Sequence, residues 1–492
     1  MNKKQSGKRL TRRGILRAGV VAGVGGAGLA ALAGCGETQV VEVVKEVPVE
    51  KVVTQEVERV VVQEKVVTQE VERVVTQIVE AMPAKQETVT VRWANWVASG
   101  ARLAQYNNLL KRFTREHPHI KVQNEPKPWP QHWDSLAVSF PAGNAQDVVW
   151  FSGATFLKFA EDGVILPINE YIKTAGVNLV DYWTQADVFD FQGQLHGIPF
   201  FHTMSYVMIN QRMFEEKGVE EPSRDWNAPG WTWDDWREKS MQLQEVDEGG
   251  QVKVWGTWVN QAFENMFGGL LIANDGDVMN PAKTRMTLGE PKSREAMRLV
   301  YQFIQEDKIS PIPADPSTFI SGAPDPFARQ VVAIRPWSTS SLSNYIAAQI
   351  PFDTVPWPTS PNTGHTGATF NANPNVVAKA TKYPDQALAF AFWLAGPDIQ
   401  DFFGSLKSQM PSYVSAAEDP EGGWLSPPPT SNFVANTGQK LDTTIDLRFH
   451  KFWLEWVVKV QEVWEKALIG EQGFDETIDE MDVEGQKILE QR

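Results

Sequence analysis

The chain has 492 residues, of which 42% are hydrophobic and 11% aromatic, a composition typical of a globular protein with a large core and more than one domain. Its formal net charge of −15 argues against nucleic acid as a partner, because binding a polyanion requires a basic face. The chain contains 1 cysteine, which excludes an internal disulfide and a cysteine-rich metal site.

Residues 1–35 have the three regions of a bacterial export signal. A basic stretch up to Arg17 precedes a Gly-rich, weakly apolar run at residues 18–32, which is too short to span a bilayer permanently. Residues 11–16 resemble the twin-arginine motif, although general secretory export stays open. Residues 32–35 resemble a lipobox ending in Cys35, so we expect a mature chain that is lipid-anchored through Cys35 on the extracytoplasmic face of the cell membrane.

Residues 36–87 form a repetitive segment rich in Val and Glu. Residues 52–61 recur intact at 66–75, which sets a period of two heptads with valines at alternating a and d positions. A short parallel coiled coil and a β-prone spacer both agree with this pattern, because valine is a mediocre helix former with high strand propensity. We expect a stalk that holds the globular part off the membrane.

Strand and helix patterns alternate along the globular part, which begins at residue 88. Val89, Val91 and Trp93 alternate as in a buried-face strand, and helical spacing then runs to Phe113, where His117-Pro118 stops the helix. Further strands are expected at residues 120–122 and 147–151, and a late helix starts at Pro384. This alternation predicts an α/β protein with parallel strands.

Six segments, in this order, resemble the family 1 extracellular solute-binding proteins, which include the maltose-binding proteins of ABC importers. The segments are residues 113–122, 143–148, 194–199, 206–218, 232–236 and 331–337. The resemblance implies two α/β lobes joined by a hinge, with a ligand cleft between them that closes on the solute. It also implies a membrane permease as partner, no catalysis and no cofactor.

The resemblance implies a discontinuous division of the globular part. We expect residues 88–201 and 354–400 in the N-terminal lobe, and residues 202–353 and 401–490 in the C-terminal lobe. In the capped helix start at residues 232–236, Thr232 is expected to accept a hydrogen bond from the amide of Asp235.

Sugar sites combine aromatic plates with planar polar side chains, and this chain has 19 tryptophans. Several aromatic and polar side chains stand at expected strand ends or at the crossing between the lobes, although core packing is the alternative for each aromatic residue. Glu125 is expected just after the second strand, Asn371 in a loop before a late strand, and Trp129 and Trp133 in a Pro-rich loop. The candidate ligand-binding residues are Trp96, Glu125, Phe151, Ser152, Thr203, Tyr206, Trp258, Trp337 and Asn371.

The expected ligand is a mono- or oligosaccharide, with a glycerol phosphate or an opine as alternatives. A secreted glycoside hydrolase is the rival from another class, because carboxylates beside aromatic plates also describe a glycosidase cleft. Its candidate pairs are Asp234 with Asp235, and Asp275 with Asp277. Helix capping explains the first pair and a turn explains the second, so we expect no catalytic residue and no metal site.

Overall fold

The computed structural model describes residues 87–491, except 98–99, 183–188, 229, 260–268, 314–324, 422, 439, 442–443 and 447–450. The expected export signal, Cys35 and all but the last residue of the expected stalk lie outside these residues. The described residues belong to one compact unit, which begins at Gln86. Within them, no helix has both the length and the apolar character needed to cross a bilayer.

The first lobe is built around three parallel strands. The first strand, β1 (Val89–Asn95), lies between β2 (Ile120–Pro126) and β3 (Val148–Trp150). The helix α3 (Gly100–Glu116) ends just before His117-Pro118, as predicted. The other main helices of this lobe are α4 (Trp129–Ser139), α5 (Gly153–Glu161), α6 (Asn169–Ala175), α12 (Pro384–Leu394) and α13 (Pro397–Ser405).

Helices cover both faces of this sheet around the carboxyl end of β1, where successive side chains point to opposite faces. On one face, the ring of Trp93 packs edge-on against Tyr106 of α3 and Phe390 of α12, with ring centroids 5.5 and 5.6 Å away. On the other face, Ala94 and Val149 pack in a layer with α4 and α5. Both faces of the sheet are therefore buried.

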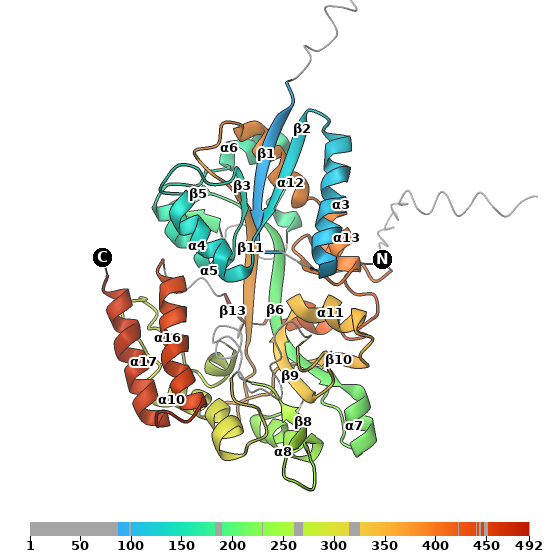
Figure 1. Cartoon of the computed structure of the whole chain (residues 1–492), viewed down its shortest axis with the longest axis vertical. Helices are drawn as coiled ribbons and strands as arrows, with labels where there is room; N and C mark the ends of the chain where they lie inside the picture. Colours follow the sequence, from blue (N-terminus) through green and yellow to red (C-terminus); the bar gives the residue numbers. More distant parts are fainter. Residues whose placement is uncertain are drawn as a thin grey trace, which may run out of the picture. The chain divides into compact units, whose positions relative to one another are not determined.

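Two long strands connect the lobes. Residues in the first half of β6 (Ile198–Asn210) pair with β11 (Ala368–Val377), and the second half pairs with β9 (Val332–Ser338) and β10 (Phe352–Val355). In the sheet, β11 continues to β3 of the first lobe. Figure 1 shows β6 and β11 side by side, running from the upper lobe into the lower one.

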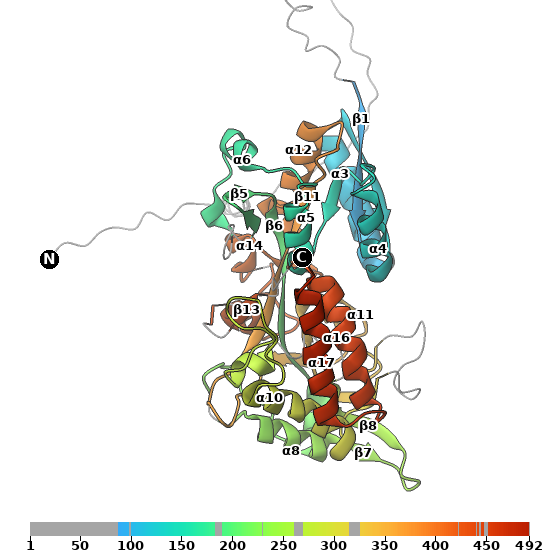
Figure 2. The ribbon, with the colours of Figure 1, turned by 90° about the vertical axis from the view of Figure 1, so that its left-hand side faces the viewer.

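The second lobe continues the sheet from β9 through β8 (Val252–Thr257) to β7 (Glu245–Val246). Its helices α16 (Trp453–Leu468) and α17 (Phe474–Leu489) pack as a pair, and Figure 2 shows the start of α16 directed toward the first lobe. The other main helices are α7 (Gln211–Lys217), α8 (Trp233–Leu243), α10 (Pro291–Tyr301) and α11 (Leu342–Ala347). The short elements are η1 (Leu179–Asp181), β4 (Asp190–Phe191), β5 (Gln194–Leu195), η3 (Gln302–Glu306), η4 (Thr339–Ser341), β12 (Met410–Pro411), α14 (Val414–Ala417), α15 (Phe433–Gly438) and β13 (Thr444–Asp446).

Residues 401–417 lie in the first lobe, whereas the sequence placed them in the second. The strand β12 pairs with β6 at Phe201 and His202. The ring of Phe403 in α13 packs against Tyr106 of α3, with ring centroids 4.6 Å apart. The chain remains on the first lobe because α13 completes the apolar layer over α3. The expected boundary at residue 354 also falls inside β10, which pairs with the second half of β6.

The capping box at the start of α8 is confirmed. The Thr232 hydroxyl accepts a hydrogen bond from the Asp235 amide at 3.2 Å, and the Asp235 carboxylate accepts one from the Thr232 amide at 2.9 Å. We expect Thr232→Ala to lower the free energy of unfolding by about 1 kcal/mol, measured by urea denaturation, because the Asp235 amide loses its acceptor. Thr174→Ala is the control, because this exposed hydroxyl donates only to backbone carbonyls of its own helix. Its loss should not lower the free energy of unfolding. Equal values for the two variants would contradict the assigned cap.

Candidate ligand-binding cleft

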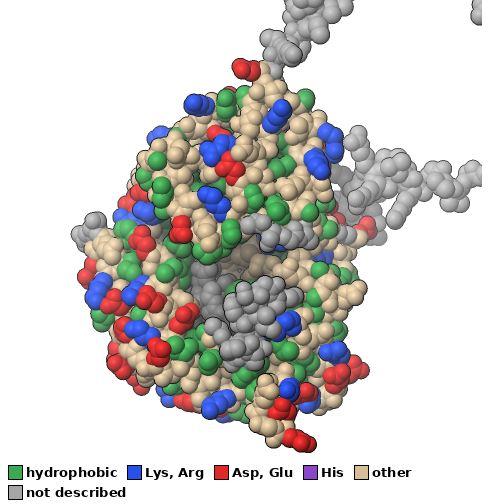
Figure 3. All heavy atoms as spheres, in the orientation of Figure 1, with side chains coloured by type: hydrophobic (Ala, Val, Ile, Leu, Met, Phe, Trp, Pro, Cys, Tyr) green, Lys and Arg blue, Asp and Glu red, His purple; other side chains and the backbone are tan. Residues whose placement is uncertain are grey.

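The floor between the lobes is the point where β6 changes partners. The amide of Met204 donates to the hydroxyl of Thr339 at 3.2 Å. The Ser205 hydroxyl accepts from the amide of Thr369 at 2.7 Å and from the indole of Trp357 at 3.1 Å. These bonds tie both crossing strands together at this level, and Figure 3 shows that the surface is hollowed between the two lobes.

A cluster of four tryptophans lies at the carboxyl ends of the parallel strands. Trp96, directly after β1, stacks on Trp150 of β3 with ring centroids 4.3 Å apart and contacts Trp129 edge-on at 4.9 Å. Trp133 packs against both Trp129 and Trp96, at 5.2 and 5.9 Å. Trp129 is 40% exposed and Trp96 is half-buried, so the cluster presents aromatic surface where ligands bind in such sheets.

The sequence placed Trp129 and Trp133 in a loop, but both lie in α4. Their spacing, continued by Ala137 and Phe140, is the helical i, i+4, i+8, i+11 pattern that would have indicated this. Pro128 and Pro130 did not break the helix, because proline fits the first turn.

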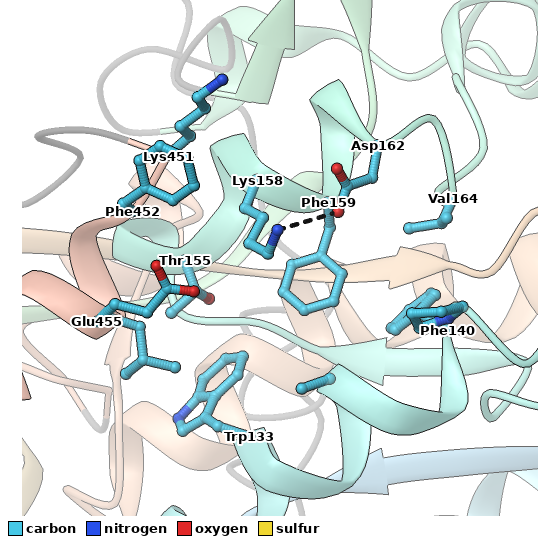
Figure 4. Close-up of a pocket in the computed structure, with 13 residues that line it drawn as sticks. Trp133, Phe140, Thr155, Lys158, Phe159, Asp162, Val164, Lys451, Phe452 and Glu455 are labelled. Atoms are coloured by element: carbon cyan, nitrogen blue, oxygen red, sulfur yellow. Dashed lines mark ion pairs between the residues drawn. The ribbon is translucent and has the colours of Figure 1, made fainter. Parts of the chain in front are cut away.

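A cavity of about 410 Å³ lies beside the tryptophan cluster and is lined by both lobes. Trp133 of α4, Phe140 directly after α4 and Phe159 of α5 face Phe452 and Glu455, at the start of α16 (Figure 4). Charged pairs lie at its edge: Lys158 contacts Asp162 at 3.4 Å, and Lys451 contacts Glu161 at 3.0 Å. An aromatic cavity with ionic groups at its edge suits an amphipathic solute.

Sequence reasoning missed the part of the cavity that comes from α5 and α16. Lys158, Phe159, Phe452 and Glu455 lie in ordinary amphipathic helices, and nothing in their spacing distinguishes them from core and surface positions. The two helices are also about three hundred residues apart in the chain. Only the packing of α16 against α5 brings them together.

Three predicted polar residues meet at the floor of the cleft. Asn371 of β11 lies opposite Thr203 of β6, and its side-chain amide donates to the Ser152 hydroxyl at 2.9 Å. The side-chain oxygen Oδ1 of Asn371 is buried and has no hydrogen-bond partner among the described residues. The expected loop around Asn371 was wrong, because these residues continue the strand β11. Gly153 permits this close approach, since a Cβ there would lie 2.4 Å from the carbonyl oxygen of Ala372.

Trp337 is the half-buried member of a second aromatic group, in the second lobe. It pairs in register with Tyr206, which is 1% exposed, and the nearby Trp258 is 6% exposed. The Arg335 guanidinium lies over the rings of both tryptophans, 4.2 Å from that of Trp258 and 4.9 Å from that of Trp337. Of these four residues, only Trp337 has substantial exposed surface.

The structure does not bring Glu125 and Phe151 to the cleft surface. Glu125 lies inside β2, not after it, and binds Arg92 through two bonds of 2.8 and 2.9 Å. Burial raises the pKa of Glu125, but hydrogen bonds from Arg92 and Gln146 outweigh burial and lower the pKa overall. Phe151 is fully buried against Trp133 and Phe159, because the chain turns into α5 directly after β3.

The carboxylate pairs considered for hydrolysis have local structural partners. Asp235 caps α8, as described above, and Asp275 forms an ion pair with Lys292 at 2.8 Å. Asp277 accepts a hydrogen bond from the Val278 amide at 2.6 Å. These contacts support the capping and turn interpretations.

Comparison with known proteins agrees with this architecture. The family model for the bacterial extracellular solute-binding proteins matches residues 98–401. A binding protein of Brucella abortus is 22% identical over 123 residues, which are 25% of this chain and 29% of that relative. The match thus spans less than a third of the curated relative.

Solved structures resemble a larger part of the chain. An ABC substrate-binding protein from Listeria monocytogenes, in complex with cycloalternan, has 21% identity and a TM-score of 0.71, covering 82% of this chain and 99% of that chain. The maltose-bound MalE3 of T. maritima has 16% identity and a TM-score of 0.69, covering 82% and 100%. At such identities the likeness shows the fold, which confirms the predicted two-lobed α/β architecture. Because the family model matches more than half of the sequence, the chain belongs to the bacterial extracellular solute-binding protein family.

Proposed function

We propose that the protein is the extracytoplasmic solute-binding subunit of an ABC importer, which binds a mono- or oligosaccharide between its lobes and delivers it to a membrane permease. The observation that carries this proposal is the tryptophan cluster at the carboxyl ends of β1 and β3, beside a cavity lined by both lobes. In this proposal Cys35 carries the lipid anchor.

Sugar chemistry matches the side chains in the cleft. The C–H face of a pyranose packs on an aromatic plate, and Trp96, Trp129 and Trp337 each have exposed surface for such a contact. Ring hydroxyls require paired donors and acceptors, and the unpaired side-chain oxygen Oδ1 of Asn371 offers an acceptor. The solved relatives described above hold cycloalternan and maltose, and a solute-binding protein from Thermotoga lettingae holds α-D-tagatose.

A thermal-shift screen of the full-length chain tests the proposal, using mono- and oligosaccharides beside glycerol phosphates and opines. A ligand at about a hundred times its Kd should add roughly 2.7 kcal/mol of stability. Stabilisation by a sugar that is recovered intact supports the proposal. Stabilisation by a non-sugar solute alone would show that the ligand is not a sugar, although the solute-binding role would stand. Recovery of cleaved sugar would identify a hydrolase instead.

The tryptophan cluster then makes a specific prediction. Trp129→Ala is expected to weaken sugar binding about tenfold in calorimetric titration, because an exposed stacking surface is lost. Phe402→Ala is the matched control: Phe402 is 38% exposed, close to the 40% of Trp129, but it lies on α13, where its ring contacts Phe403 and not the tryptophan cluster. An equal effect of both substitutions would contradict a role for the cluster in binding.

A further inference from the structure

Four buried hydrogen-bond donors in the second lobe have no acceptor. They are the hydroxyls of Tyr206 and Tyr345, the indole N–H of Trp258 and the Nε–H of Arg335. None forms a hydrogen bond of normal geometry with a described residue, although the Tyr345 hydroxyl lies near Ser341 and the Asp325 carboxylate. The four side chains, which we call the Arg335 group, are between 0% and 6% exposed. A buried donor without a partner is costly, so four in one group call for an acceptor that the described chain does not supply.

The guanidinium of Arg335 lies among aromatic rings, directly beside the half-buried ring of Trp337. The guanidinium carbon lies 4.2 Å from the ring centre of Trp258, 4.9 Å from that of Trp337 and 5.9 Å from that of Tyr345. Tyr206 lies opposite Trp337 on the neighbouring strand. Arg335 is thus clamped between rings, which holds its planar donors in one orientation.

Arg335 already has one anionic partner, but this pair leaves donors free. Its Nη1 lies 2.8 Å from the Asp325 carboxylate, whose side chain is 25% exposed. Neither this Nη1 nor the Nε on the other edge of the guanidinium forms a hydrogen bond of normal geometry with a described residue. One cation that is partly neutralised by Asp325 suits a ligand with a single negative charge better than a multiply charged phosphate.

We propose that the Arg335 group binds the carboxylate of an acidic sugar, such as a uronic acid, whose ring packs on Trp337. This inference rests on the proposed function and names the ligand class of that cleft. A carboxylate has only acceptor oxygens, which match a guanidinium, two hydroxyls and an indole N–H. A neutral sugar presents a hydroxymethyl group there, which has one acceptor oxygen and brings a further donor.

Calorimetric titration of the full-length chain with matched ligand pairs tests this proposal. The pairs are mono- and disaccharides of glucuronic, galacturonic and mannuronic acid, each beside its neutral counterpart. For at least one pair, the acid should bind about tenfold or more tightly than the neutral sugar, the discrimination that a charged hydrogen bond supports. Arg335→Gln should abolish that difference between acid and neutral sugar, whatever its effect on binding of the neutral sugar itself. Arg294→Gln, a surface arginine paired with Asp475 and Asp479, is the control and should preserve the difference.

The outcomes separate this inference from the proposed function. If neutral sugars bind and no acid binds more tightly than its counterpart, the carboxylate site is wrong and the sugar-binding role stands. If no sugar of either kind binds, both proposals are wrong. Should near-UV circular dichroism show that Arg335→Gln does not fold, Tyr206→Phe with Tyr345→Phe removes only the two hydroxyls. That double variant should weaken binding of the acid several-fold more than binding of the neutral sugar, and equal losses would overturn the proposal.

Discussion

The free energy of unfolding is expected to fall steeply below about pH 6.5, before most carboxylates titrate, because two histidines are fully buried in their neutral form. Burial lowers the pKa of His202, which is fully buried beside Phe370 with both ring nitrogens unpaired among the described residues, to about 3. Burial also lowers the pKa of His132 to about 4, against the opposing effect of its contact with the Trp150 carbonyl.

The direction of this pH dependence follows from the lowered pKa values of both histidines. In the unfolded chain each imidazole takes up a proton near its ordinary pKa of 6.5, whereas the folded chain takes up neither until far lower pH. Stability is therefore complete above that value and is lost as the pH falls toward the folded-state pKa values. Each histidine contributes a slope of about 1.4 kcal/mol per pH unit, so the pair costs roughly 4 kcal/mol between neutral pH and about pH 5.

Urea denaturation at a series of pH values measures this loss. His202→Gln and His132→Gln should each lower the slope by about 1.4 kcal/mol per pH unit between about pH 6.5 and pH 5, whatever their cost at neutral pH. Burial also lowers the pKa values of His196 and His117, which add to the slope in the same direction. A slope that persists in both buried-site variants would show that other groups cause the acid loss.

Gly256→Ala is expected to destabilise the protein by about 3 kcal/mol or more, because the added methyl group has no space. Gly256 lies in β8, and a Cβ there would be 1.9 Å from the carbonyl oxygen of Ser240 and 2.5 Å from its carbonyl carbon. Ser240 belongs to α8, which also contacts β8 through a hydrogen bond from Trp236 to Thr257 at 3.2 Å. The clash is with backbone, so relief requires the whole helix to move.

Urea denaturation at neutral pH, with tryptophan fluorescence as the signal, tests this close contact. Gly473→Ala is the matched control, because a Cβ at this position, just before α17, would meet no atom within 4 Å. Gly473→Ala should lower the free energy of unfolding by at most about 1 kcal/mol, because alanine is a slightly poorer residue than glycine at the N-cap of a helix. If Gly256→Ala is as stable as this control, α8 does not approach β8 as closely as the structure indicates.

Local patterns predicted most of the elements in the described part of the chain. The alternation around Val91 and the stop at Pro118 are confirmed as β1 and the end of α3, and Pro384 begins α12. These signals act through neighbouring residues, so they can be read without the fold. The assignment failed for α4, where two prolines suggested a loop, and around Asn371, where asparagines suggested a loop inside β11.

The candidate site was predictable only in part. Trp96 and Ser152 follow strand ends, and a strand end can be inferred from sequence. The burial of Phe151 and the pairing of Glu125 with Arg92 were not predictable, because both depend on which side chains α5 and β1 bring alongside. The same holds for the cavity, whose walls come from α4, α5 and α16.

The sequence by itself determined the family, the two-lobed α/β architecture and the order of its elements, because hydrophobic period, caps and prolines act over a few residues. The tertiary structure alone decided which aromatic side chains remain exposed in the cleft and which are core. Trp129 and Trp150 are both tryptophans near strand or helix ends, yet one is 40% exposed and the other 1%. Exposure is set by contacts between residues that are distant in the chain, and those contacts exist only once the layers have packed.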